Sequence, residues 1–104
     1  MKFTRERNKR GFVINYFEDD YGEKCSLQKS SSIDPHIWLG IAHANPIIMC
    51  SDASKLGIER KANNGWQEYE IPEEVFINTR MHLTKRQARR LAMKLLKFGL
   101  FGKV

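Results

Sequence analysis

The residues best suited to chemistry lie close together near position 80. Arg80 and His82 alternate along a predicted strand, so both project from one face of it. Thr84 then occupies the N-cap position of a predicted helix whose first residues are cationic, although a helix N-terminus already carries about half a positive charge. Free backbone N–H groups, a hydroxyl and cations suit phosphate. The pattern predicts an anion site formed by Arg80, His82, Thr84, Lys85 and Arg86.

A second polar set lies on a predicted hairpin. Ser26, Gln28 and Ser30 alternate along one strand and offer groups that suit ribose, phosphate or a base edge. Trp66 follows Asn64-Gly65, and we expect it to be exposed enough to stack on a base or cover a pocket. Trp38, within an apolar strand, is assigned to the core.

These assignments have ordinary structural alternatives. Arg80 has Glu73 and Glu74 nearby in the sequence as ion-pair partners. His82 is equally suited to a hydrogen bond within the sheet, and serines are common on solvated strand faces. Trp66 is also suited to structural packing.

Metal and catalytic signatures are lacking in the sequence. The three histidines, His36, His43 and His82, are dispersed, and Cys25 and Cys50 fit no metal-ligand spacing. There is no nucleophile elbow, P-loop or glycine-rich dinucleotide turn. We therefore expect a non-catalytic protein without metal or cofactor, whose two thiols are reduced.

Charge is distributed unevenly along the 104 residues. The net charge is +6, a basic cluster occupies residues 2–10, and no acidic residue follows Glu74. A basic helix and N-terminus of this kind attract nucleic acid or other phosphate-bearing partners, although a solvated helix face is the simpler interpretation. No apolar run is long enough to span a membrane, and the N-terminus does not resemble a secretory signal, so we expect a cytosolic protein.

The hydrophobic pattern predicts an α+β fold. We expect a loose, basic segment at residues 1–10 and a single domain at residues 11–104. That domain would contain a mostly antiparallel sheet of four to six strands, beginning with a hairpin, and one C-terminal amphipathic helix packed on it. Strands are predicted at residues 12–17, 23–29, 36–41, 47–50, 66–71 and 80–83, with a loop or short helix at 51–65 and a helix at 85–98. A capping box of Thr84 and Gln87 would start the helix, and Gly99 would end it.

Several segments together resemble a family of small phage and prophage proteins. They are Asp20-Tyr21-Gly22, Cys25-Ser26-Leu27-Gln28-Lys29-Ser30-Ser31, Ile37-Trp38-Leu39-Gly40, Gly65-Trp66 and Thr79-Arg80-Met81-His82-Leu83-Thr84. The resemblance extends from about residue 12 to residue 98, and residues 49–64 and the strongly basic helix depart from it. It implies an origin in a virus of bacteria, whose small accessory proteins often disarm host defences.

Three functions are compatible with these features. The favoured one is capture of a phosphate-bearing nucleotide signal of bacterial immunity in the host cytoplasm. The second is inhibition of a host defence protein, as anti-CRISPR proteins do, through the aromatic hairpin tip and residues 51–65. The third is regulation through nucleic acid, bound by the basic N-terminus and helix. A homo-oligomer built with the apolar Leu100-Phe101 tail is compatible with each.

Overall fold

The computed structural model describes residues 1–104, which form two compact units. One unit comprises residues 1–43 and 79–104, and the other comprises residues 44–78. This differs from the single domain expected from residue 11 onward. The reason is local pairing: β5 (Ile47–Met49) pairs with β6 (Trp66–Glu68) and with no strand of the larger sheet.

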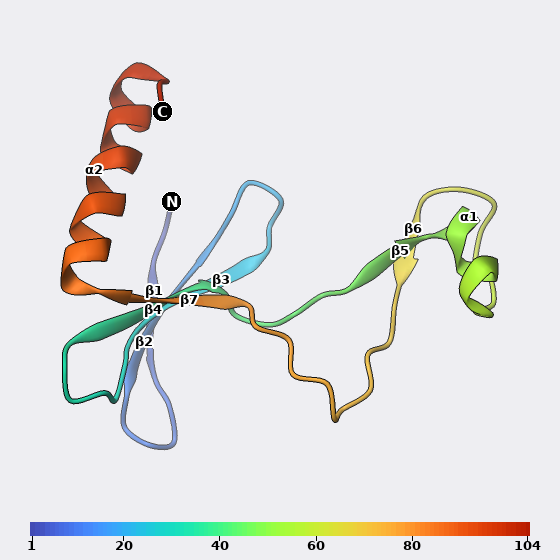
Figure 1. Cartoon of the computed structure of the whole chain (residues 1–104), viewed down its shortest axis with the longest axis horizontal. Coiled ribbons are helices and arrows are strands. Elements are labelled where there is room, and N and C mark those ends of the chain that lie inside the picture. Colours follow the sequence, from blue (N-terminus) through green and yellow to red (C-terminus); the bar gives the residue numbers. More distant parts are fainter. The chain divides into compact units, whose positions relative to one another are not determined.

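The larger unit is built on a five-stranded antiparallel sheet (Figure 1). Its order is β1-β2-β3-β4-β7, so the only connection that is not a hairpin is the one from β4 to β7. The strands are β1 (Thr4–Arg7), β2 (Val13–Glu18), β3 (Lys24–Lys29), β4 (His36–Ile41) and β7 (Arg80–Thr84). The predicted mostly antiparallel sheet with a C-terminal helix packed on it is thus confirmed.

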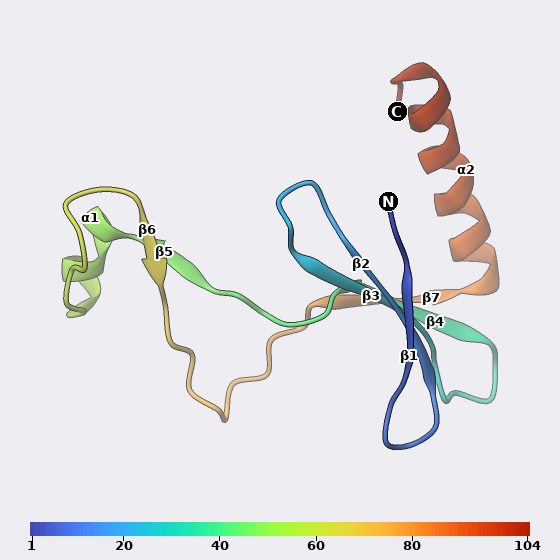
Figure 2. The ribbon, with the colours of Figure 1, turned by 180° about the vertical axis from the view of Figure 1, so that it is seen from behind.

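The N-terminal segment differs from the loose arm that its charge suggested. Thr4–Arg7 forms an edge strand that pairs with β2, as the view from behind shows (Figure 2). The turn between them is fixed by Asn8, whose side-chain oxygen accepts hydrogen bonds from the backbone N–H groups of Arg10 and Phe12, both 3.0 Å. Gly11 completes the turn at φ +86°, a conformation that glycine adopts without steric cost.

The C-terminal helix α2 (Lys85–Phe101) begins with the predicted capping box. Thr84 Oγ1 accepts from the backbone N–H of Gln87 (3.1 Å), while Gln87 Oε1 accepts from the backbone N–H of Thr84 (3.0 Å). The helix runs three residues beyond the predicted end. Gly99 lies inside it, and Gly102, at φ +68°, caps it instead. Leu100 and Phe101 are therefore exposed helical residues and do not fold back on the sheet.

The alternation of side chains gives the sheet two different faces. What we call the polar face carries Thr4, Glu6, Ile14, Tyr16, Glu18, Lys24, Ser26, Gln28, His36, Trp38, Gly40, Arg80, His82 and Thr84. What we call the apolar face carries Phe17, Cys25, Leu27, Ile37, Leu39, Ile41, Met81 and Leu83, among others. Helix α2 contacts β7 and β4, and Ala88 shares a small hollow with Ile37 and Leu83 of the apolar face.

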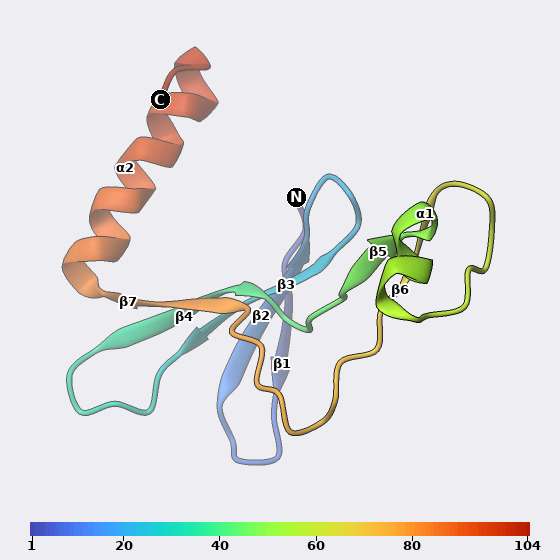
Figure 3. The ribbon, with the colours of Figure 1, turned by 45° about the vertical axis from the view of Figure 1, so that its right-hand side comes forward.

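The smaller unit holds its own compact core. Helix α1 (Cys50–Ala53) and the 3₁₀ helix η1 (Ser54–Leu56) follow β5 directly, beside the β5–β6 pair (Figure 3). Cys50 and Ala53 are buried. Gln67 is buried as well, and its amide accepts from Lys61 N–H (3.1 Å) and donates to the Glu59 carbonyl (3.2 Å). None of the helices in the chain combines the length and apolar composition needed to cross a bilayer.

Candidate functional site

Four planar groups form a continuous column on the polar face. The His36 and His82 rings stack with centroids 4.5 Å apart and planes 14° apart. His82 also stacks on Trp38, at 4.1 Å and 29°. The Arg80 guanidinium carbon lies 5.3 Å from the centroid of the Trp38 ring. Antiparallel pairing of β4 with β7 produces the column, because Trp38 lies opposite His82 in the register.

Arg80 is held in place by a hydrogen bond that reaches across β4. Its Nη1 donates to Gln28 Oε1 on β3 at 3.1 Å. The register explains how the side chain passes, since Gly40 is the residue of β4 that lies opposite Arg80 and carries no side chain. A Cβ on Gly40 would lie 2.3 Å from the Thr79 carbonyl oxygen and 2.7 Å from Arg80 Cα. The guanidinium is thus oriented by an amide and a ring, and not by Glu73 or Glu74.

His36 anchors the opposite end of the column. Its Nδ1 lies 2.8 Å from the backbone carbonyl oxygen of Asp34 and 3.2 Å from Ser32 Oγ. A carbonyl oxygen only accepts, so the proton of His36 is on Nδ1 when the ring is neutral. Both ends of the column are therefore fixed by hydrogen bonds, which preorganises its planar groups before any ligand arrives.

The remaining predicted residues have different surroundings. Ser26 and Ser30 lie on the polar side but are buried, at 2% and 9% exposure, and Ser30 Oγ accepts from the Ser32 N–H. The Thr84 hydroxyl is engaged in the capping box. Lys85 and Arg86 are exposed on the first turn of α2. The structure thus brings Arg80, His82 and Gln28 together as the accessible part of the predicted site.

Trp66 belongs to the other unit. It is 64% exposed on β6, opposite Met49 of β5.

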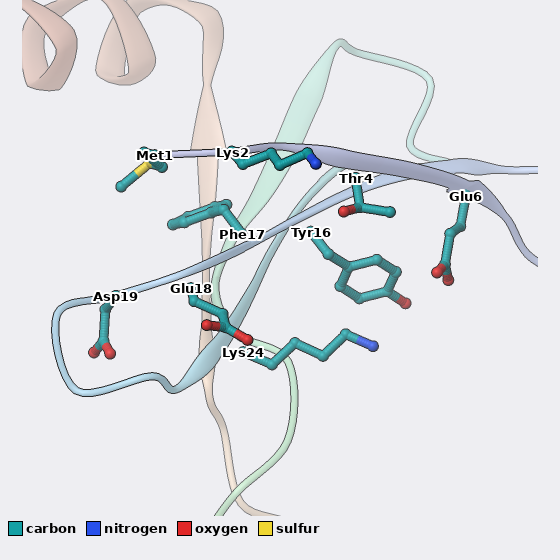
Figure 4. Close-up of a pocket in the computed structure, with 9 residues that line it drawn as sticks. All are labelled: Met1, Lys2, Thr4, Glu6, Tyr16, Phe17, Glu18, Asp19 and Lys24. Carbon is teal, nitrogen blue, oxygen red and sulfur yellow. The ribbon is translucent and has the colours of Figure 1, made fainter.

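The far end of the polar face is hollowed but carries no net positive charge that would favour phosphate. A cavity of about 630 Å³ lies between the N-terminal residues and β2–β3 (Figure 4). Lys24 lies over the Tyr16 ring, with its Nζ 4.1 Å from the centroid. Three carboxylates, on Glu6, Glu18 and Asp19, line the same cavity and balance the cations of the Met1 N-terminus, Lys2 and Lys24. An anion is therefore better placed at the Arg80 end of this face.

The basic residues of the chain outnumber the acidic ones, and the excess is concentrated in α2. One ion pair joins Lys55 to Asp52 at 3.0 Å, within the smaller unit. The six cations of α2 have no carboxylate partner and no acidic residue in their helix: Lys85, Arg86, Arg89, Arg90, Lys94 and Lys97. Unpaired cations on an exposed helix create a positive potential that attracts anionic ligands.

Comparisons of the chain with models of protein families, with curated proteins and with solved structures found no match. The function therefore has to be argued from the polar face itself.

Two members of the column escaped sequence reasoning. The apolar composition of residues 36–41 predicts a core position for Trp38, and the sequence offers His36 only as a dispersed candidate metal ligand. The signal was the alternation within this strand. His36, Trp38 and Gly40 occupy one set of positions, and Ile37, Leu39 and Ile41 occupy the other. In an antiparallel sheet, the alternating positions of a strand face opposite sides of the sheet, so the two sets can differ in polarity.

Proposed function

We propose that this protein binds a phosphate-bearing nucleotide on the polar face of its five-stranded sheet. The observation that supports the proposal is the column of His36, His82, Trp38 and Arg80. Planar side chains offer a base a stacking surface, and a guanidinium that is already oriented offers phosphate a charge-assisted, bidentate contact. Gln28, which fixes Arg80, also carries an amide suited to a base edge.

The proposed role is capture and not turnover. In keeping with the resemblance to phage accessory proteins, the captured ligand would be a nucleotide signal of bacterial immunity. Binding would withdraw that signal from its effector in the host cytoplasm. Arg80 and His82 would contact phosphate, and Trp38 would contact the base.

Tryptophan fluorescence provides a direct test. In a Trp66→Phe background, Trp38 is the sole tryptophan, so a base that stacks on it quenches the whole signal. The probes are ribonucleoside mono-, di- and triphosphates and cyclic dinucleotides, titrated at fixed ionic strength. We expect saturable quenching by at least one of them. Absence of quenching and of calorimetric binding by every probe would contradict the proposal.

Arg80→Gln then locates the phosphate contact. Loss of a charge-assisted hydrogen bond costs about 1.5–3 kcal/mol, so binding should weaken about tenfold or more. Lys24→Gln is the matched control, since it removes one cation from the hollowed end of the same face, away from Arg80. It should change the affinity less than threefold. Equal losses in both variants would indicate general charge attraction without a site at Arg80.

Nucleic acid is a second candidate ligand, and the unpaired cations of α2 favour it. A single strand would extend from the column towards the helix. Its binding should fall steeply with salt, because each neutralised phosphate releases counterions. A fluorescein-labelled 20-nucleotide single strand, titrated between 50 and 200 mM salt, separates the alternatives. A combined Arg86→Gln, Arg90→Gln and Lys94→Gln variant should weaken strand binding strongly and mononucleotide binding little.

A further inference from the structure

Gln28 lies directly beside the tryptophan of the column. It is paired with Trp38 in the register of β3 and β4, and Trp38 is paired with His82 of β7. The three side chains therefore form one row across the polar face, with the Cβ atoms of neighbours about 4.5–5.5 Å apart. Gln28 and Trp38 are both half-buried. A base held against Trp38 thus has the Gln28 amide at its edge.

The contact with Arg80 determines which way the Gln28 amide faces. The N–H groups of a guanidinium only donate, so the amide atom that lies 3.1 Å from Arg80 Nη1 is the oxygen. The amide nitrogen is on the other branch of the side chain, and its N–H groups donate to no other group of the protein. The amide therefore has its oxygen engaged by a cation and both of its donors available to a ligand.

This orientation changes the base that the glutamine can recognise. A glutamine without other partners binds adenine through both amide atoms, because its oxygen accepts from the N6 amino group while its nitrogen donates to N7. The Gln28 oxygen is instead shared with Arg80, whose remaining N–H groups lie next to it. The edge of the site beside Trp38 therefore presents mainly hydrogen-bond donors to a base.

An edge that presents donors matches guanine better than adenine. Guanine carries two neighbouring acceptors, O6 and N7, whereas adenine carries the N6 amino donor in the place of O6. The N6 amino group would face other donors and lose its hydrogen bond to water without replacement. The Ser26 hydroxyl, two positions along β3 on the same face, is only 2% exposed and so gives a ligand no accessible acceptor.

We propose that Gln28 makes the polar face selective for guanine nucleotides over adenine nucleotides. This inference rests on the proposed function, because it names the base of the ligand that the column binds. The Gln28 nitrogen donates to O6 and N7 of guanine, while its oxygen orients Arg80 for the phosphate. One amide thus acts on both parts of the ligand. A base contact of this kind favours the matching base about fivefold or more.

Fluorescence titration of the Trp66→Phe chain measures the preference. The probes are the mono-, di- and triphosphates of guanosine, inosine and adenosine, together with cyclic di-GMP and cyclic di-AMP. Guanosine probes should bind about fivefold or more tightly than the adenosine probes of the same phosphate number. Inosine keeps O6 and N7 but lacks the N2 amino group, so it should bind like guanosine. Equal or tighter binding of adenosine would overturn this inference alone, whereas absence of binding by every probe would overturn the proposed function with it.

Gln28→Glu assigns the preference to this residue. One carboxylate oxygen still accepts from Arg80, and the other replaces the N–H donors with an acceptor, so the preference for guanine should disappear or reverse. Gln87→Glu is the matched control, because it adds the same charge and glutamate also completes a capping box with Thr84. It should leave the preference unchanged. The ratio of the two dissociation constants is compared, so a general loss of phosphate affinity cancels. An unchanged ratio in Gln28→Glu would overturn the role of Gln28.

Discussion

The two faces of the five-stranded sheet differ in the contacts that their side chains make. The polar face uses its own side chains as partners, since rings stack on rings and Arg80 is held by Gln28. The apolar face has little cover of its own. Helix α2 reaches it only with its first turns, and Ile41 and Met81 remain exposed.

This difference separates a surface that is complete in one chain from a surface that is not. Stacked and hydrogen-bonded groups are preorganised, so a ligand that binds them does not have to order them first. Exposed apolar residues gain free energy only when a further surface removes them from water. The contrast therefore favours a ligand on the polar face and a second protein surface on the apolar side.

Gly40→Ala should have the largest effect, because β4 and β7 support both faces. The added Cβ would lie 2.3 Å from the Thr79 carbonyl oxygen, so the β7 backbone has to move. We expect the free energy of unfolding to fall by about 3 kcal/mol, near the upper end for ordinary substitutions. Urea denaturation followed by circular dichroism measures it.

Gly99→Ala is the matched control for this change. Gly99 lies inside α2, and nothing lies within 4 Å of an added Cβ. Its replacement should raise helix stability by up to about 1 kcal/mol, since glycine is the poorer helix former. The same substitution of glycine by alanine should thus lower the free energy of unfolding at position 40 and raise it at position 99. If Gly40→Ala is as stable as the wild type, the backbone of β7 does not lie as close to Gly40 as the structure shows.

Trp38→Leu should have the next largest effect and tests the polar face alone. It removes the stack with His82 and the contact with Arg80 while keeping an apolar side chain. Aromatic and cation–π contacts each contribute about 0.5–1.5 kcal/mol, so we expect a loss of about 1–2 kcal/mol in urea denaturation. Trp66→Leu, at an exposed position, should change stability by less than about 0.5 kcal/mol. Equal losses would contradict a special role for the column.

The elements that the sequence predicted well are those specified by local chemistry. The β2–β3 hairpin follows from Asp19, whose carboxylate accepts from the backbone N–H groups of Tyr21 and Glu23. The start of α2 follows from the capping box of Thr84 and Gln87. Such contacts join residues at most four positions apart, so the sequence alone displays them.

The column depends on contacts that the sequence does not display. Arg80 and Gln28 are 52 positions apart, and β4 must lie between their strands before the hydrogen bond forms. The sequence predicted both residues as part of a site, but it did not predict that they bond to each other or that Arg80 contacts Trp38. The sequence did not predict β1 for another reason. The basic residues near the N-terminus suggested a loose segment, although Asn8 and Gly11 form a turn that lets Thr4–Arg7 pair with β2.

Thr84→Ala should have a smaller effect and tests the junction between β7 and α2. It removes the acceptor for the backbone N–H of Gln87, and loss of an N-cap costs about 1 kcal/mol. Thr84→Ser keeps the hydroxyl and should recover most of that loss. Urea denaturation measures both variants, and amide hydrogen exchange of residues 85–90 should be faster in Thr84→Ala only. Failure of serine to restore stability would contradict the capping role.

Replacement of Cys25 should have the smallest effect, and it tests whether water reaches this part of the apolar face. Burial raises the pKa of its thiol above 9.0, and the negative charges of Asp19 and Glu23 raise the pKa further. Near and above pH 9 the unfolded chain then loses this proton more readily than the folded chain. The stabilisation from the protonated thiol is therefore complete below pH 9 and is lost as pH rises through the folded-state pKa.

The test compares the wild type with Cys25→Ala between pH 7.5 and 10.5. All other residues are common to both proteins, so the difference between their free energies of unfolding isolates the contribution of Cys25. We expect the advantage of the wild type to shrink from pH 9 upward and its Cys25 to react slowly with iodoacetamide at pH 8. A constant difference across the whole range would mean that water reaches the Cys25 thiol, and that this part of the apolar face is open to solvent.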